Sequence, residues 1–164
     1  YWCDTDFVGT DGINGGKYTS TEIKSMILNL WPKSQKSKPY VVCTGGEPLL
    51  QMDDDLIFSI HNAGFEIGIE TNGTVSPPKN IDWVCVSPKA KADIVITKGN
   101  ELKIVYPQCG INPRMYENLD FEHFFIQPMD GKGQKEAIKE SEKFVMKNPL
   151  WKLSLQTHKI MGIP

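Results

Sequence analysis

Cys3 is followed at once by Asp4, Thr5 and Asp6, so a thiol stands next to three oxygen-bearing side chains. Thiolates favour Fe–S clusters, Zn or Cu(I), whereas hydroxyl and carboxylate oxygens favour Mg or Ca. The segment therefore offers a soft ligand and hard ligands within a few residues. A lone free cysteine is more often a small packed hydrophobic side chain, so a metal-site interpretation depends on the rest of the chain.

Polar residues with chemical uses follow five apolar runs. These endings are Gly45-Gly46-Glu47, Glu70-Thr71-Asn72-Gly73, Ser87-Pro88-Lys89, Gln127-Pro128 and Gln156-Thr157-His158. Glycine has no Cβ and lets a backbone approach a ligand closely, and Glu47 beside the two glycines can accept hydrogen bonds from an amine. A Ser-Pro-Lys ending can face an anion, and the Gln127 amide can read a flat heterocycle. Each ending also has an ordinary structural explanation, such as a tight turn, an Asn-Gly turn or a solvated lysine.

Helices are predicted at three places from apolar residues with helical spacing. The first begins at a capping box of Thr19 and Glu22 and ends before Pro32. The second covers residues 49–63, and the third covers residues 134–147. The inward positions expected for the third helix are Ala137, Ile138, Phe144 and Val145.

Strands are predicted at residues 40–44, 65–70, 83–86, 102–106, 124–126 and 153–157. The first is almost continuously apolar, a pattern typical of a strand covered on both faces. Alternation of strands with helices or long connections indicates a parallel sheet built by crossovers, in which ligands bind at the carboxyl ends of strands. Several connections are too short for full crossover helices. The predicted fold class is therefore α/β, an incomplete (β/α)6-type TIM-like barrel with reduced helices, in one domain of residues 1–164.

Composition narrows the classes of function. The 164 residues have a net charge of −2, which gives no reason to expect nucleic-acid or membrane attraction. Arg114 is the only arginine, so bidentate phosphate clamps are scarce. No apolar run approaches the roughly 18 residues of a membrane span, and no signal peptide is visible. The four cysteines have no disulfide-like spacing, so a reducing, cytoplasmic setting is expected.

Taken together, the motifs resemble the radical S-adenosylmethionine superfamily and, within it, the 7-carboxy-7-deazaguanine synthase family of the queuosine pathway. The matching segments run through nearly the whole chain in the family's order. They are Trp2-Cys3-Asp4-Thr5-Asp6-Phe7, Thr44-Gly45-Gly46-Glu47-Pro48-Leu49, Glu70-Thr71-Asn72-Gly73-Thr74, Ser87-Pro88-Lys89, Gln127-Pro128-Met129-Asp130 and Leu153-Ser154-Leu155-Gln156-Thr157-His158-Lys159.

The resemblance implies roles for particular residues. Cys3 is similar to the last of three cysteines that bind a [4Fe–4S] cluster, and Thr5 to the family's Mg²⁺ ligand. Residues implied to contact S-adenosylmethionine are Gly45, Gly46, Glu47, Asn72, Ser87, Lys89 and Gln127. Residues implied to contact a pterin substrate are Thr44, Glu70, His158 and the terminal carboxylate of Pro164. No catalytic residue is assigned beyond those that position the cofactor.

The implied reaction is a radical ring contraction. A reduced cluster would cleave S-adenosylmethionine to methionine and a 5′-deoxyadenosyl radical, which would take a hydrogen from C6 of 6-carboxy-5,6,7,8-tetrahydropterin. Rearrangement, with Mg²⁺ orienting the carboxylate, and loss of ammonia would give 7-carboxy-7-deazaguanine. The resemblance also implies a flavodoxin- or ferredoxin-type electron donor, a homodimer, and no direct contact with nucleic acid or membrane.

The chain begins at Tyr1 without a methionine, so we expect the first barrel strand and the other two cluster cysteines to lie upstream. Two alternatives stay open from the sequence. One is another radical S-adenosylmethionine enzyme, such as a glycyl-radical activase. The other is a non-catalytic barrel that binds a pterin or purine and only mimics the cluster loop.

Overall fold

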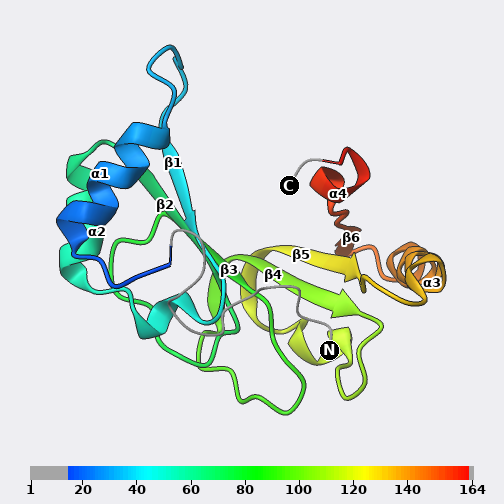
Figure 1. Cartoon of the computed structure of the whole chain (residues 1–164). Helices are drawn as coiled ribbons and strands as arrows, with labels where there is room; N and C mark the ends of the chain where they lie inside the picture. The colour runs from blue at the N-terminus through cyan, green and yellow to red at the C-terminus, as the bar shows by residue number, and fades with distance from the viewer. Residues whose placement is uncertain (1–14, 163–164) are drawn as a thin grey trace.

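The computed structural model describes residues 15–162, apart from the side chain of His158. Its centre is a six-stranded sheet (Figure 1). The strands are β1 (Tyr40–Cys43), β2 (Glu66–Thr71), β3 (Trp83–Val86), β4 (Lys98–Tyr106), β5 (Asp120–Pro128) and β6 (Trp151–Leu153). Each strand pairs in parallel with the next, in the order of the sequence. This confirms the α/β class and the crossover topology, and it brings all carboxyl ends to one edge.

The sheet is strongly curved, but it does not close within the described residues, because β1 and β6 form no pair there. The helices are α1 (Ser20–Leu30), α2 (Asp54–Asn62), α3 (Gln134–Lys147) and α4 (Thr157–Ile160), with short 3-10 helices η1 (Pro48–Leu50) and η2 (Pro113–Tyr116). In Figure 1, α1 and α2 lie together beside the β1–β2 end of the sheet, and α3 lies near β5 and β6. No helix among residues 15–162 is long and apolar enough to span a bilayer.

Local capping signals determine where α1 and α2 begin. The capping box predicted at α1 is present: the Thr19 amide donates to Glu22 Oε2 at 2.7 Å, and the Glu22 amide donates to Thr19 Oγ1 at 3.3 Å. Asp53 caps α2 by accepting a 2.8 Å hydrogen bond from the Leu56 amide. This second cap makes the predicted continuous helix 49–63 wrong, since residues 51–53 separate η1 from α2.

Three further predictions need correction. The predicted strand 153–157 is wrong, because β6 ends at Leu153 and residues 157–160 form α4. On α3, Ser141 is fully buried, whereas Ile138, expected to point inward, is 38% exposed. Val42 on β1 is 48% exposed, so the described residues cover only one face of that strand.

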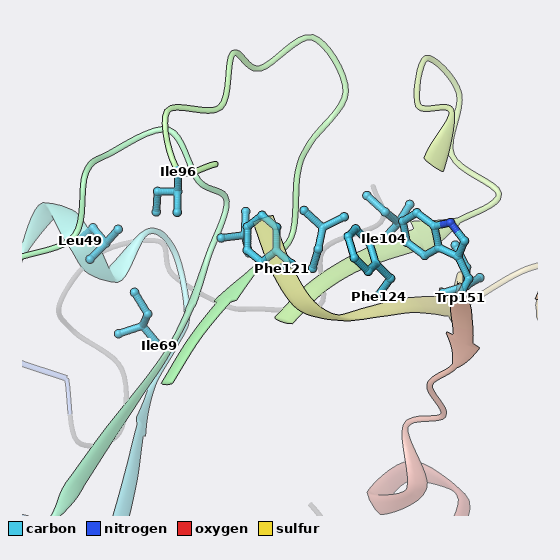
Figure 2. Packing of buried hydrophobic residues seen from close by; sticks show 10 residues of the cluster. Leu49, Ile69, Ile96, Ile104, Phe121, Phe124 and Trp151 are labelled. Atoms are coloured by element: carbon cyan, nitrogen blue, oxygen red, sulfur yellow. The ribbon is translucent and has the colours of Figure 1, made fainter. Parts of the chain in front are cut away.

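The main hydrophobic core extends along one face of the sheet (Figure 2). It runs from η1 across the strands to β6, through Leu49, Ile69, Val86, Ile96, Leu102, Ile104, Phe121, Phe124, Ile126 and Trp151. A second cluster of Ile57, Ile60, Phe65 and Ile67 packs α2 against β2. Since side chains alternate along a strand, packing one set of residues into this core directs the intervening residues to the other face.

Candidate functional site

The face of the sheet opposite the core carries polar side chains together with the aromatic rings of Trp83 and Phe125, which contact the His123 ring. Glu70, Cys85, Glu101 and His123 are register partners on β2, β3, β4 and β5. Register partners in a parallel sheet share a face, and the next position along three of these strands belongs to the core. We call the face that carries these four residues the polar face.

Several residues predicted for the site continue the polar face toward the carboxyl edge. Ser87 lies two residues beyond Cys85, and Gln127 lies four residues beyond His123, so both keep the alternation of their strands. Thr44 directly follows the β1 residue that pairs with Ile69; it is therefore level with Glu70, and it is exposed. Side chains that stand far apart in the sequence are thus brought to one edge.

The Gly45-Gly46-Glu47 turn is joined to the end of β2 by the Glu47 carboxylate. Its Oε1 accepts hydrogen bonds from the Thr71 hydroxyl at 2.6 Å and from the Leu49 amide at 3.1 Å. Its Oε2 accepts one from the Asn72 amide at 2.8 Å. A carboxylate offers roughly four acceptor positions, so protein donors already take three. Glu47 therefore fastens two strand ends together.

The two glycines before Glu47 take backbone conformations that favour glycine. Gly45 has φ of 82° and Gly46 has φ of 55°, values that L-residues with a Cβ adopt rarely. Neither position carries a Cβ that would stand between the peptide groups of this turn and a ligand. Binding of a ligand at this turn stays a prediction.

The next two strand endings are also held in defined geometry. Asn72 Oδ1 accepts hydrogen bonds from the amide and hydroxyl of Thr74 at 2.9 and 2.7 Å, as in an Asx turn. The Ser87 amide donates to the Thr71 carbonyl at 2.7 Å, which ties the ends of β2 and β3. Lys89 Nζ donates to Ser87 Oγ at 3.0 Å. A cation and a hydroxyl therefore lie together at this edge, a combination that suits a carboxylate or phosphate ligand.

A cavity of about 290 Å³ adjoins the end of β5. It lies between the β5 ending, α3 and the segment around α4, and it is lined by Pro128, Asp130, Gln134, Ile138, Leu155, Gln156, Lys159 and Ile160. Asp130 Oδ2 accepts from Lys159 Nζ at 2.6 Å, and this bond contributes most to holding the pKa of Asp130 below its ordinary value. The mixed apolar and polar lining resembles that of small-molecule sites.

Four predicted site positions cannot be placed in this geometry. Cys3, Thr5 and Pro164 lie outside the described residues, and His158 lies on α4 without a described side chain. Within residues 15–162, no three His, Cys, Asp or Glu side chains are grouped to hold a metal ion. Burial raises the thiol pKa of both Cys43 and Cys85, which disfavours the thiolate form that metals bind.

Comparison with known proteins places this geometry in a family. No family model matches the chain. The 7-carboxy-7-deazaguanine synthase of Bordetella pertussis is 49% identical over 164 residues, covering 99% of this chain and 78% of the relative. The synthases of Bradyrhizobium diazoefficiens and Burkholderia multivorans are each 51% identical, covering 99% of this chain and 77% and 78% of the relatives. The chain belongs to the 7-carboxy-7-deazaguanine synthase family.

A solved structure supports the fold of this synthase family member. QueE from Escherichia coli superposes with a TM-score of 0.64 at 23% sequence identity. The match covers 85% of this chain and 64% of the Escherichia coli chain. At this level of identity, the likeness concerns the arrangement of strands and helices.

Two residues of the polar edge in this synthase family member were missed from the sequence. Thr71 is 2% exposed and donates to Glu47, whereas the sequence motif points only to Glu70 and Asn72 on either side of it. Lys103 on β4 donates to Glu70 Oε1 at 2.8 Å. Lys103 is the single lysine in the otherwise apolar run Leu102–Tyr106. A charge inside such a run needs a partner, and this feature of the sequence could have indicated the ion pair.

Gln108 follows β4 at the same edge and has an unusual environment. Its Nε2 and Oε1 atoms are both buried, and neither has a hydrogen-bond partner among residues 15–162. A buried polar group without a partner costs roughly 1–3 kcal/mol. Replacing Gln108 by an apolar side chain of similar size is therefore expected to stabilise the protein.

Proposed function

We propose that this protein catalyses the radical-mediated ring contraction of 6-carboxy-5,6,7,8-tetrahydropterin to 7-carboxy-7-deazaguanine, with loss of ammonia. The observation that carries the proposal is identity of about half over 99% of the chain to relatives named for this product. The polar strand endings, gathered at one edge of a parallel sheet, support it. We also propose that the sheet is part of an incomplete barrel, because parallel strands in sequential order form the wall of such a barrel.

The edge fits S-adenosylmethionine. The peptide groups of Gly45 and Gly46, which no Cβ covers, would receive its amino group, because the Glu47 carboxylate is largely occupied by protein donors. Ser87 and Lys89 would hold its carboxylate, since they place a hydroxyl and a cation 3.0 Å apart. Bound S-adenosylmethionine with its [4Fe–4S] cluster would supply one-electron chemistry and the abstraction of hydrogen.

The adenosine part would extend toward the end of β5. Gln127 lies on the polar face at the end of β5, where its amide can meet the flat ring. Asn72 lies at the opposite side of the edge, where its amide donates to Glu47. These residues orient the cofactor and exclude water around it, which is the protein's principal contribution to such chemistry.

The substrate would lie over the polar face. Thr44 and Glu70 are level with each other on neighbouring strands, and both side chains are exposed toward the open side. A carboxylate at this position suits the amino-substituted edge of a pterin, which presents N–H donors. His158 and the carboxylate of Pro164 are proposed as further contacts, Cys3 as a cluster ligand and Thr5 as the ligand of Mg²⁺.

The partners follow from the same chemistry. A flavodoxin- or ferredoxin-type protein is proposed as the electron donor, and a homodimer as the assembly. Direct contact with nucleic acid is not expected at a net charge of −2.

Anaerobic reconstitution of the full-length protein tests the function. We expect about four irons per chain and the absorbance spectrum of a [4Fe–4S] cluster. We also expect conversion of the free pterin with S-adenosylmethionine, Mg²⁺ and a reductant. Iron-free protein that still binds the pterin would favour a non-catalytic binder. Iron-loaded protein that leaves the pterin unchanged would favour another radical enzyme, such as a glycyl-radical activase.

A further inference from the structure

Lys103 and Glu70 form an ion pair that crosses the middle of the polar face. Glu70 lies on β2 and Lys103 on β4, with β3 between them. Lys103 Nζ donates to Glu70 Oε1 at 2.8 Å over Cys85, the β3 register partner of Glu70. The Lys103 side chain is 14% exposed and that of Glu70 is 44% exposed. The Lys103 ammonium is therefore largely shielded from solvent, whereas the Glu70 carboxylate is partly exposed on the polar face.

The groups around Lys103 keep its ammonium charged. Burial alone would lower the pKa of Lys103, but Cys85, Glu70 and Glu101 outweigh burial and hold that pKa above its ordinary value. The two carboxylates that face Lys103 belong to Glu70 and Glu101. A buried ammonium needs such partners, because leaving it unpaired in the interior is costly.

Only one oxygen of Glu70 is used by this pair. Among residues 15–162, no donor contacts Oε2 of Glu70, and the side chain remains partly open. An ionised carboxylate only accepts hydrogen bonds, so its natural partner is a flat ring with an amino group beside a ring N–H. The ion pair fixes the carboxylate before such a ring binds, which removes part of the entropy cost of binding.

We propose that Lys103 is a positioning residue for substrate recognition: by gripping Oε1 of Glu70 it presents this carboxylate to the amino-substituted edge of the heterocyclic substrate. This inference rests on the proposed function, which supplies the pterin. In this role Lys103 contributes to the affinity and specificity for the substrate. The residues at the strand ends bind the cofactor and support the radical chemistry.

A purely structural role for the pair predicts something different. Glu70 is exposed enough to be solvated alone, and methionine keeps the unbranched shape of the lysine side chain at a position that is 14% exposed. Lys103→Met should therefore fold. If the pair served stability alone, the substitution would change stability and leave pterin affinity unchanged.

The test uses full-length protein with a reconstituted cluster and bound S-adenosylmethionine. Dissociation constants for 6-carboxy-5,6,7,8-tetrahydropterin and for S-adenosylmethionine are measured for wild type, K103M, K103R and the control K98M, which removes an exposed lysine at the start of β4. We expect K103M to raise the Kd and KM for the pterin about 10- to 100-fold, the effect of disturbing one charge-assisted hydrogen bond. The Kd for S-adenosylmethionine and the kcat should stay within about threefold, K103R should recover most of the affinity, and K98M should match wild type.

A double substitution separates positioning from other effects. If Lys103 acts through Glu70, the double variant E70Q/K103M should bind the pterin less than about threefold more weakly than E70Q alone. Pterin affinity that is equal in wild type and K103M, or an additive loss in the double variant, would overturn the inference while the proposed function stands. Wild type that fails to bind the pterin would overturn the proposed function and the inference with it. If K103M does not fold, K103Q replaces it in the same measurements, and a pterin affinity of K103Q equal to that of wild type would overturn the inference.

Discussion

Glu47 offers the sharpest test of how the structure differs from the sequence motif. The motif predicts a carboxylate that binds the amino group of the cofactor, whereas the structure has it joining the ends of β1 and β2. Glu47→Gln separates these roles because it keeps the size of the side chain and changes one acceptor oxygen into a donor. If Glu47 mainly joins the two strand ends, the substitution lowers the stability of the protein even without cofactor. If Glu47 mainly accepts hydrogen bonds from the amino group of the cofactor, the substitution lowers only the affinity for the cofactor.

The magnitude follows from the three hydrogen bonds that Glu47 accepts. With its amide oxygen at the Oε1 position, the substituted side chain would keep the bonds from Thr71 and Leu49 without the negative charge, and it would place an NH₂ group against the Asn72 amide. Hydrogen bonds to charged groups contribute roughly 1.5–3 kcal/mol. Losing one and weakening two should therefore lower the free energy of unfolding by about 2–4 kcal/mol.

Urea unfolding of the protein without cofactor measures this change. Glu66→Gln is the matched control, because Glu66 pairs with Lys38 at the surface, with side chains 38% and 65% exposed. Such surface pairs contribute at most about 1 kcal/mol. If E47Q unfolds at the same urea concentration as wild type and only its affinity for S-adenosylmethionine falls, Glu47 does not stabilise the joined strand ends and this interpretation is wrong.

Three further predictions concern other parts of the chain. Thr5→Ala should raise the Mg²⁺ concentration needed for turnover while iron content stays near wild type; a loss of iron with unchanged Mg²⁺ dependence would refute the assignment. Burial would raise the pKa of Asp82, but hydrogen bonds from the Ile67 amide and from His61 outweigh burial and hold that pKa below its ordinary 3.8. The stabilisation from Asp82 is therefore fully present above pH 3.8 and is lost as pH falls through the lower folded-state value. Asp82→Asn should be less stable than wild type near neutral pH, and acid titration of unfolding should show the difference shrinking below pH 3.8. Gln108→Met should raise the free energy of unfolding by about 1 kcal/mol, because it removes two buried polar atoms that have no partner in the described part of the chain; an unchanged or lower urea midpoint would count against it.

Much of the fold was predictable because its signals are local. The capping box at Thr19 and Glu22 lies within one helical turn, and β3 and α3 have the bounds expected from apolar spacing. The failures occurred where a local signal had a competitor. Asp53 supplies a second cap inside the predicted helix 49–63, and at the end of the chain a short helix replaces the expected strand.

The sequence by itself determined which residues stand at the strand ends and hence the chemical character of the edge. Only the tertiary structure decided which of them meet. The Glu47 carboxylate reaches a hydroxyl 24 residues away, and Lys103 reaches Glu70 across 33 residues and an intervening strand. Such contacts depend on sheet register, and a shift of one residue would send every side chain of a strand to the opposite face. Register is set by the packing of the whole core, which no short stretch of sequence contains.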